Sequence, residues 1–543
     1  MSDTAPLRAR GNPTWDEVLR RNSVERYKQQ KHGYDVIYDL ERYGTIPYEE
    51  IPEEDILRMQ WWGIYHDKPK VGYFMLRIKI PSGILTPQKL RVIGEISQEF
   101  ANNTGELTTR QDIQLHWVRL SSVPTMFALL EQNRLTTAGA CGDNMRNITS
   151  CPVAGIDPEE LFDVRPTVEA FARFFYGNRQ YGNLPRKHKH TIAACPYHCN
   201  APEIHDIAWV GTIQDGQEGY ACWVGGGLSA TPRIAKPLGV FVPKDEALEV
   251  ARALIDLWQE DLRYRVSRAK ARFKFLIDDD GVEKTRQRLE ERLGRKLPDL
   301  REVPVPKGRT DHMGIHPQKE KGLYYVGFPC FPGLMRGDQM VKIASLLEEF
   351  GGEFRITREQ NFLLTGIPEP RVTEIVERVS QIGFPLQTHP MRATSIGCTG
   401  SPHCNYAVGE TKMKLIEIVD HLEKRFGPGL GSIRIHLDGC PHACGQHWVG
   451  DLGLQGTTRT LPAGRVQAYD VIVRGGLGRE AGIGKPILRR VPTQEVNQVV
   501  ERLVGAWIAR RTDGESLPGF FRRLSDEEIQ AIAAGQELGS GQG

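Results

Sequence analysis

The chain of 543 residues is long enough for roughly three or four domains. Hydrophobic residues make up 40% of it and charged residues 25%, which is an ordinary composition for a globular protein. The formal net charge of +2 gives no reason to expect a nucleic-acid partner, and no apolar run of about 18 residues predicts a membrane span.

Cysteine usage and the N-terminus predict the cellular compartment. The first residues lack the apolar core of a secretory signal and include early acids. Ten cysteines in so long a chain are too sparse for a disulfide scaffold, so clustered cysteines are expected to bind metal or to act in catalysis. We therefore expect a cytoplasmic, metal-bearing protein.

The first secondary-structure elements follow a repeating order. Residues 1–60 are charged and rich in turn formers, and one amphipathic helix is predicted at Trp15–Gln29. An alternating strand pattern begins at Gly72. Strand, helix, strand and helix are predicted in turn at 72–80, 87–100, 106–118 and 124–133. This order indicates an α+β unit.

The same order of elements returns about 250 residues later, a period too long for a solenoid. The stretch that ends at Phe350 aligns without gaps with the stretch that ends at Phe100. After a slip of two residues, Thr357-Arg358 aligns with Thr109-Arg110. Further aligned pairs are Cys151 with Cys398, Cys195 with Cys440, and Cys199 with Cys444. We interpret the pattern as an internal duplication that gives a pseudo-twofold molecule with a site shared between its halves.

The duplication sets the predicted domain boundaries. The charged, proline-bearing segment 278–314 is expected to link the halves. The remaining units are expected to be an N-terminal extension (1–60), a first half-domain (61–140), a first large domain (141–277), a second half-domain (315–385), a second large domain (386–515) and a C-terminal tail (516–543).

Four cysteines of the second half form two close pairs, Cys398 with Cys404 and Cys440 with Cys444. Thiolates are soft ligands that suit zinc or an iron–sulfur cluster. Structural zinc sites usually space their cysteine pairs by two to four residues, so the wider first pair favours a bulkier iron–sulfur cubane. The alternative is four unrelated buried thiols.

The first half has an incomplete version of this cysteine frame. It contains Cys151, Cys195 and Cys199, but Asp157 occupies the position that matches Cys404. Three alternatives are open for these thiols: ligands of a second cluster, a relic of the duplication, or ordinary core residues.

Basic residues gather in otherwise structured segments of the first half. If residues 186–190 are extended, Lys187 and Lys189 point to the same side and repel one another unless an anion lies between them. Arginine binds oxyanions through its planar fork and lysine as a point charge. The basic residues concerned are Arg77, Arg110, Arg146, Arg186, Lys187 and Lys189.

Several motifs together resemble one known family. CTGSPHC and CPHAC, with TTRQDIQLHW, DNMRN and LPRKHK, resemble the ferredoxin-dependent assimilatory sulfite and nitrite reductases that contain sirohaem and a [4Fe-4S] cluster. The similarity covers residues 45–515, including the duplication. It implies an α+β, internally duplicated, pseudo-twofold architecture with ferredoxin-like half-domains.

The resemblance also implies roles for individual residues. The cluster ligands would be Cys398, Cys404, Cys440 and Cys444, and Cys444 would also bridge to the sirohaem iron. The anion would be bound and protonated by Arg77, Arg146, Lys187 and Lys189. The sirohaem carboxylates would be held by Arg110 and Gln114.

The motifs give opposing indications about the substrate. Lys187 and Lys189 follow the Lys-x-Lys pattern of sulfite-reducing relatives, whereas Glu410-Thr411-Lys412 is more typical of nitrite reductases. We expect sulfite, with nitrite as the alternative. Tyr65 matches a tyrosine that is crosslinked to cysteine in some relatives, but Asn144 stands at the cysteine position, so no crosslink is expected.

Two histidines alternate with these lysines in the sequence. His188 and His190 are expected to be exposed rather than to donate protons.

The sequence contains no spaced G-x-G-x-x-G fingerprint of a dinucleotide-binding module, so electrons are expected from a separate protein, ferredoxin. Ferredoxin is expected to dock near basic pairs such as 489–490, 510–511 and 522–523. The alternatives of another class are a non-catalytic cluster-bearing electron-transfer or regulatory protein and a zinc-structured binding protein.

Overall fold

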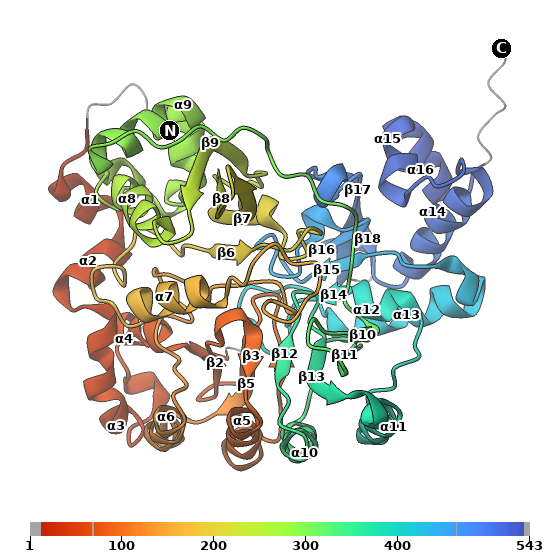
Figure 1. Ribbon diagram of the computed structural model, residues 1–543, viewed down its shortest axis with the longest axis horizontal. Helices are drawn as coiled ribbons and strands as arrows, with labels where there is room; N and C mark the ends of the chain where they lie inside the picture. Colours follow the sequence, from red (N-terminus) through yellow and green to blue (C-terminus); the bar gives the residue numbers. More distant parts are fainter. Residues whose placement is uncertain (1–11, 68–69, 463, 537–543) are drawn as a thin grey trace.

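The structure, a computed structural model, describes residues 12–67, 70–462 and 464–536. Figure 1 shows the two halves of the chain side by side, the first in red to green and the second in green to blue. Four β-sheets form the interior, and helices lie mainly around the outside. Within the described residues, no helix combines the length and the apolar content needed to cross a membrane.

The predicted N-terminal helix is divided in two at Asn22, between α1 (Trp15–Arg21) and α2 (Ser23–Gln30). The Asn22 side chain accepts a hydrogen bond from the backbone N–H of Val24 at 3.2 Å and donates one to the carbonyl of Arg265 at 2.7 Å. Because that cap also reaches the first large domain, it anchors the extension there. Two further short helices are α3 (Leu40–Tyr43) and α4 (Glu53–Arg58).

Two related sheets, each with two helices beneath it in Figure 1, form the half-domains. The first sheet has the order β1-β2-β5-β4 and the second β10-β11-β13-β12-β3. The strands are β1 (Ile64–His66), β2 (Phe74–Ile78), β3 (Ile84–Leu85), β4 (Glu106–Leu107), β5 (Ile113–Val118), β10 (Gly314–Pro317), β11 (Leu323–Phe328), β12 (Phe354–Ile356) and β13 (Phe362–Pro368). The helices are α5 (Pro87–Phe100), α6 (Val123–Gln132), α10 (Gly337–Glu348) and α11 (Val372–Ile382).

The two half-domains are interlocked. Strand β3 of the first half pairs with β12 in the sheet of the second, and the backbone N–H of Leu107 donates to the carbonyl of Gly333 at 2.9 Å. Helices α5 and α10 cross where Gly94 meets Gly337, and a Cβ added to Gly337 would lie 2.5 Å from the carbonyl oxygen of Gly94. One hydrophobic core therefore runs beneath both sheets.

The two large domains share a second sheet topology, in which the first strands are parallel and the last are antiparallel. The strands of the first are β6 (His190–Ala193), β7 (Ile207–Gln214), β8 (Gln217–Val224) and β9 (Lys236–Pro243). Those of the second are β14 (Ile396–Gly397), β15 (Ile435–Asp438), β16 (Leu452–Leu461), β17 (Gly464–Val473) and β18 (Lys485–Pro492).

Each large domain packs its sheet against helices around its own hydrophobic core. The helices are α7 (Arg165–Phe175), α8 (Ala247–Gln259), α9 (Lys274–Leu293), α12 (Pro390–Thr394), α13 (Lys412–Phe426), α14 (Val496–Arg510), α15 (Leu517–Arg523) and α16 (Asp526–Ala534). Most of α9 lies within the segment expected to be a linker, so the irregular connection between the halves is shorter than its composition indicates.

A turn at residues 108–112 interrupts the strand predicted over 106–118. The Oγ1 of Thr108 accepts the backbone N–H of Arg110 at 3.2 Å, and Gln111 has a positive φ of 58°. Local side-chain to backbone bonds of this kind compete with a continuous strand. The turn lifts Arg110 out of the sheet, toward the junction with the large domains.

The equivalent turn of the second half corrects the predicted alignment of the repeat by one residue. Gln111 and Gln360 both have positive φ, at 58° and 64°. Each donates its side-chain amide to a backbone carbonyl of the opposite half, at 2.9 and 2.8 Å. Arg358 therefore matches Thr109, not Arg110.

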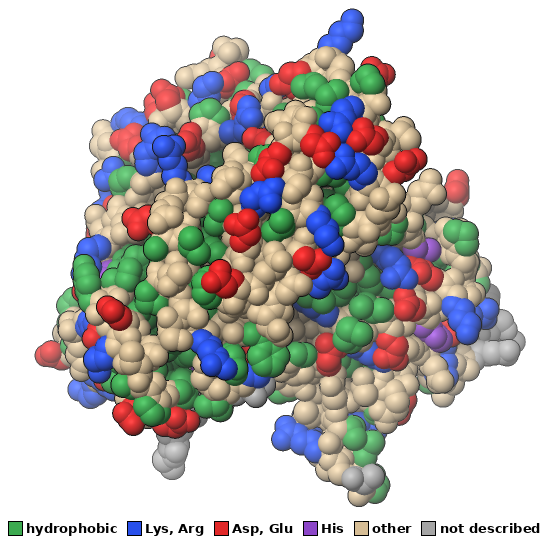
Figure 2. Space-filling view, turned by 90° about the horizontal axis from the view of Figure 1, so that it is seen from below, with side chains coloured by type: hydrophobic (Ala, Val, Ile, Leu, Met, Phe, Trp, Pro, Cys, Tyr) green, Lys and Arg blue, Asp and Glu red, His purple; other side chains and the backbone are tan. Residues whose placement is uncertain are grey.

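The face of the half-domain helices carries charges of both signs. Figure 2 shows the molecule from below, where α5 and α10 lie in Figure 1, with basic and acidic side chains interspersed. Arg91 of α5 pairs with Glu348 of α10 at 2.7 Å, and Arg378 of α11 pairs with Glu349 at 2.5 Å. This interspersion agrees with the small net charge of the chain.

Candidate functional site

The four predicted cluster cysteines come from loops at one edge of the second large sheet. Strands β14 and β15 are parallel neighbours, so their carboxyl ends meet at the same edge. Cys398 follows β14 directly and Cys440 follows β15 after Gly439, whose backbone N–H points at the Cys398 sulfur at 3.3 Å. The loop with Cys404 and the loop with Cys444 continue from these two positions.

The loop after β15 is held in a specific shape by Asp438. Its carboxylate accepts the backbone N–H of Gly445 at 2.6 Å and contacts the ring Nδ1 of His447 at 2.8 Å. Ala443 and Gln446 both adopt a positive φ, at 55° and 66°. The result is a tight loop that leaves Cys444 exposed.

The chemistry of the four thiols fits a polynuclear metal centre. Burial raises the pKa of Cys398 and of Cys404, and it raises the pKa of Cys440 to about 12. Thiolates at these positions need a cationic centre to stabilise them. Among the described residues, no three of these sulfurs lie within 4.8 Å of one another. One zinc ion needs a separation of about 3.8 Å, whereas a cubane spreads its cysteines more widely.

Cys444 faces a basic cavity at the junction of the halves. The lining includes Lys187, Lys189 and Arg110 from the first half together with His442 and Cys444 from the second. Within the part of the chain that the structure describes, neither lysine forms an ion pair with a carboxylate. The structure thus brings two predicted anion-binding residues and one predicted cofactor-binding arginine to the predicted bridging cysteine.

The two lysines lie on an extended segment whose alternate residues point in opposite directions. Lys187 and Lys189 are half-buried at the cavity, whereas His188 and His190 are fully buried. The expectation that the histidines are exposed is therefore wrong. The ring of His188 packs against the ring of Trp258, with centroids 5.2 Å apart, and burial lowers the pKa of His188 to about 4.

A buried ion pair fixes the backbone of the second lysine. The Lys189 backbone N–H donates to Asp206 at 2.9 Å, and Arg272 contacts the same carboxylate at 2.8 Å. Asp206 is fully buried, and Arg272 reaches it from the segment between α8 and α9. Sequence reasoning missed Arg272, because no local motif marks it.

The two predicted substrate arginines meet at one carbonyl. Arg77 of β2 and Arg146 both donate to the carbonyl of Ala140, at 3.4 and 2.9 Å. The backbone N–H of Arg146 donates to the carbonyl of His188 at 2.9 Å, so this arginine lies on the segment next to the lysines. Burial lowers the pKa of Arg146.

Gln114 lies between an arginine and the cluster loop. Its Oε1 accepts from Arg77 at 3.0 Å, and its Nε2 contacts Thr399, next to Cys398, at 2.7 Å. The Nε2 also donates to Glu106. Gln114 thus connects the first half-domain to the cluster loop, where the sequence indicated a contact with sirohaem.

Arg110 is half-buried at the centre of the junction, and its partial burial lowers its pKa to about 10. Its Nη1 lies 2.6 Å from Nε2 of His205, and its Nη2 donates to the carbonyl of His190 at 3.1 Å. The Nε atoms of Arg110 and Arg146 are buried without a hydrogen-bond partner among the described residues. Orphaned cationic donors of this kind fit a ligand with many carboxylates.

The electrostatic state of the cavity follows from its like charges. Burial, together with Arg186, Arg146 and Arg272, lowers the pKa of Lys187 to about 7, although Cys444 raises it. Burial and the neighbouring Lys187 lower the pKa of Lys189 well below its usual value. An anion entering the cavity would favour the charged form of both lysines.

A threonine next to Arg110 was missed by the sequence analysis. The Oγ1 of Thr109 donates to the carbonyl of Cys444 at 3.1 Å, so the first half holds the cysteine loop of the second. Its position beside Arg110 in the TTRQ motif could have identified Thr109 as a site residue.

Tyr65 and Asn144 are the two positions considered for a tyrosine–cysteine crosslink. Tyr65 lies on β1, where burial raises its pKa, and the amide of Asn144 donates to the carbonyl of Cys141 at 2.6 Å.

Of the arginines considered for ferredoxin docking, Arg489 forms a salt bridge with Asp470 and Arg523 with Glu515, each at 2.7 Å. Because these arginines are paired, they offer less charge to a partner than the sequence indicated.

Two family models match the chain in both halves. The model described as "Nitrite and sulphite reductase 4Fe-4S domain" matches residues 141–297 and 391–528. The model described as "Nitrite/Sulfite reductase ferredoxin-like half domain" matches residues 66–133 and 316–382. The paired matches confirm the predicted duplication.

Relatives and a solved structure cover nearly the whole chain. It is 33% identical to "Sulfite reductase [ferredoxin] 1" of Mycolicibacterium paratuberculosis, over 98% of this chain and 100% of that one. It is 34% identical to "Assimilatory ferredoxin-dependent nitrite reductase" of Haloferax mediterranei, over 93% and 91%. The solved structure of the Mycobacterium tuberculosis NirA protein matches with a TM-score of 0.90 and 30% identity, over 96% and 100%. These matches confirm the predicted α+β, duplicated architecture.

Proposed function

The chain belongs to the nitrite and sulphite reductase family, and we propose that it reduces sulfite to sulfide with electrons from ferredoxin. The chain is an oxidoreductase of the ferredoxin-dependent sulfite and nitrite reductase type, with a [4Fe-4S] cluster and sirohaem. The non-catalytic and zinc-structured alternatives are therefore set aside. The cytoplasmic location expected from the sequence stays a prediction.

The observation that carries the sulfite proposal is the pair of unpaired lysines in the cavity. Lys187 and Lys189 line it together with Arg110. Sulfite carries up to two negative charges near neutral pH, whereas nitrite carries one. Two ammonium groups on the same side of one segment are better balanced by the more highly charged anion.

We propose that Cys398, Cys404, Cys440 and Cys444 would hold the cluster, and that Cys444 would also help to hold sirohaem. Support comes from the position of Cys444, the exposed member of the set, at the cavity wall. Arg110, with its orphaned Nε, is assigned to the sirohaem carboxylates. Gln114 is assigned a positioning role, because it holds Arg77 and the loop of Cys398.

When bound, sirohaem and the cluster would pass electrons from ferredoxin to the anion, which takes up six in its reduction to sulfide. The chain binds and orients the anion through Arg77, Arg146, Lys187 and Lys189. Fixed positive charge at the oxygens that gain electron density stabilises the transition state. Lys187, with a pKa of about 7, can donate a proton to an oxygen that leaves as water and then regain one from solvent.

Nitrite remains the second candidate, because a relative named as a nitrite reductase is as similar as one named as a sulfite reductase. Both anions need a reductant, a positive cavity and protons. The difference between them is in charge and in the number of oxygens removed, which the lysine pair addresses directly.

Steady-state kinetics with each anion test the proposal. The purified holoenzyme would be assayed with reduced ferredoxin, and with a reduced viologen as a control for donor docking. We expect kcat/KM for sulfite to exceed that for nitrite by about tenfold or more, which corresponds to roughly 1.4 kcal/mol. A higher kcat/KM for nitrite with both donors would reverse the assignment.

A further inference from the structure

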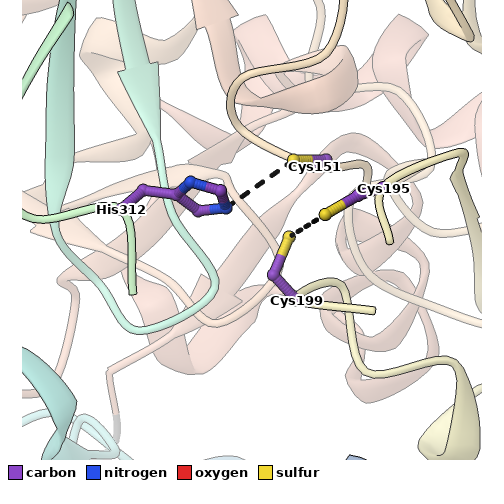
Figure 3. Close-up of side chains that lie close together, drawn as sticks. All are labelled: Cys151, Cys195, Cys199 and His312. Carbon is purple, nitrogen blue, oxygen red and sulfur yellow. Dashed lines mark hydrogen bonds between the residues drawn. The ribbon is translucent and has the colours of Figure 1, made fainter. Parts of the chain in front are cut away.

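Three cysteine side chains of the first half and one histidine side chain lie close together, as Figure 3 shows. The Sγ of Cys151 lies 3.7 Å from Nε2 of His312, and the Sγ atoms of Cys195 and Cys199 lie 3.9 Å apart. All four ligand atoms lie within 4.8 Å of one another. We propose that they bind a single zinc ion in a tetrahedral, structural site separate from the cavity at Cys444.

The spacing distinguishes one ion from the other uses of these thiols. Tetrahedral zinc, with Zn–S of about 2.3 Å and Zn–N of about 2.0 Å, places its ligand atoms roughly 3.5–3.8 Å apart. A cubane puts a different iron atom under each ligand and needs wider separations. A disulfide needs sulfurs about 2.05 Å apart, far closer than Cys195 and Cys199. The observed distances therefore fit one ion.

The backbone of the loop that carries two of these cysteines matches that of the cluster loop. His198 and Ala201 both have a φ of 51°, and their equivalents in the second half, Ala443 and Gln446, have φ of 55° and 66°. Positive φ at two non-glycine residues is uncommon, so its recurrence at equivalent positions is a property of the fold. The loop from Cys195 to Cys199 thus has the shape that presents thiolates to a metal in the other half.

The fourth ligand explains why the first half does not repeat the cluster. Asp157 replaces the cysteine that matches Cys404, and the structure brings His312 to the three thiols from the segment between the halves. Nδ1 of His312 lies 3.5 Å from the hydroxyl of Tyr325, which leaves Nε2 free to face the sulfurs. Such a contact orients a ligating imidazole. Three thiolates and one imidazole form a structural zinc set.

Burial indicates a closed site. Cys151, Cys195 and His312 are 2%, 4% and 5% exposed, and only Cys199 reaches the half-buried class. The backbone N–H of Tyr197 donates to the Cys195 sulfur at 3.4 Å, a contact that stabilises a thiolate. No position on such a centre is open to a substrate, so its role is to hold segments together.

The segments that it would hold lead to the catalytic cavity. Arg358 donates to the carbonyl of Cys199 at 3.2 Å and to Oε1 of Gln446 at 2.6 Å. Gln446 lines the cavity two residues after Cys444. The ion would link His312, in the segment between the halves, to the loop of Cys199. Arg358 contacts both this loop and the loop of Cys444, so the ion would also help to position Cys444.

Metal analysis of the intact holoenzyme tests the site. Zinc and iron would be measured per chain by plasma mass spectrometry, and the zinc environment by X-ray absorption at the zinc edge, which sirohaem and the cluster do not obscure. We expect about one zinc per chain, with three sulfur neighbours at about 2.3 Å and one nitrogen at about 2.0 Å.

Variants assign the ligands and guard against a loss of folding. Cys199→Ser and His312→Ala should lower the zinc content at least several-fold while iron and sirohaem content stay near those of the unchanged chain. His312→Cys should retain zinc but show four sulfur neighbours, which a misfolded protein could not do. The matched control is Cys222→Ser, a change at a fully buried thiol on β8 outside this group, which should leave zinc unchanged.

Each other outcome overturns the proposal. Zinc in the unchanged chain no higher than in Cys199→Ser would show that the four groups bind no ion. Iron beyond one cluster and one sirohaem, lost together in His312→Ala, would indicate a second iron centre. A Cys195–Cys199 disulfide found by alkylation and mass spectrometry would assign the thiols to redox chemistry. None of these results would bear on the reduction of sulfite.

Discussion

At the scale of single residues, the cavity concentrates positive charge that the protein itself does not neutralise. Among the described residues, Lys187 and Lys189 form no salt bridge with a carboxylate, and Arg110 and Arg146 each keep a buried Nε without an acceptor. Unpaired cations that are partly withdrawn from water are costly, so they are retained where a ligand compensates them. This is the physical basis for assigning them to anionic groups.

Lys189 is expected to determine which anion is reduced. Lys189→Asn removes one of two ammonium groups that a dianion needs, so kcat/KM for sulfite should fall by about 10²-fold and that for nitrite by much less. The measurement is steady-state kinetics with each anion. A control at Lys236, an exposed lysine at the start of β9, should change neither value when it is replaced by Asn. Equal losses for the two anions would contradict the selecting role.

A pH profile tests the charge of the first lysine. Burial lowers the pKa of Lys187 to about 7, and cofactor carboxylates would raise it again. The charged form binds the anion, so kcat/KM should fall as pH rises through that pKa, at or above pH 7. In Lys187→Arg, whose guanidinium stays charged, this decline should move to higher pH. An unchanged decline would assign it to another group.

At the scale of elements, buried ion pairs connect segments that are distant in the sequence. The side chain of Asp143 is 1% exposed, and it contacts Arg186 at 3.0 Å, Arg268 at 2.7 Å and Lys28 of α2 at 3.9 Å. Although burial opposes ionisation, these cations hold the pKa of Asp143 below its usual range. The N-terminal extension and the segment before the lysines therefore meet at one carboxylate.

Asp143→Asn should lower stability by about 1–3 kcal/mol, because it removes a buried carboxylate from Arg186 and Arg268, which are only partly buried, and from Lys28, which keeps Glu25. The folded pKa is depressed, so the stabilisation is present above the unfolded pKa of about 3.9 and is lost as pH falls through the folded pKa. The melting temperature of the unchanged chain should therefore drop more steeply below pH 5 than that of the variant. Parallel pH curves would show that the carboxylate is not ionised in the folded protein.

The crossing of α5 and α10 gives an element-scale prediction about packing. Gly337→Ala would place a Cβ 2.5 Å from the carbonyl oxygen of Gly94, so the helices must move apart, at about 1–3 kcal/mol. The melting temperature should fall. Gly505→Ala in α14 is the control, since its Cβ would meet only Phe426, at 3.6 Å, and it should be neutral or slightly stabilising. A lower melting temperature for the control alone would refute the packing argument.

The elements also show what could be predicted from the sequence. Helix α5 begins and ends where its apolar spacing and Pro87 indicate, because both signals lie within the helix itself. The turn before β5 could not be predicted, since side-chain bonds from Thr108 interrupt an otherwise strand-like run. His188 was misjudged because its burial depends on Trp258, which is distant in the sequence.

The sites were predictable to different degrees for the same reason. Cysteine pairs and the lysine pair are close in sequence, so their spacing carries the signal. His312 lies in an irregular connection and meets Cys151 only after the halves fold together. Arg272 likewise reaches Asp206 across the domain. Long-range convergence of this kind leaves no local pattern to read.

At the scale of the whole molecule, the duplication has produced two halves with different tasks. Each half holds a cysteine loop of the other: Thr109 contacts the carbonyl of Cys444, and Arg358 that of Cys199. The basic side of the cavity comes mainly from the first half and the cysteine side from the second. The reaction that we propose therefore depends on both halves being joined.

Competition between the two anions tests the proposed preference for sulfite. The holoenzyme would receive sulfite and nitrite at equal concentrations with reduced ferredoxin, and sulfide and ammonium would be measured in the same vessel over time. The ratio of the initial product rates equals the ratio of the two kcat/KM values. We expect sulfide to form about tenfold faster or more. Ammonium forming faster than sulfide would contradict this preference.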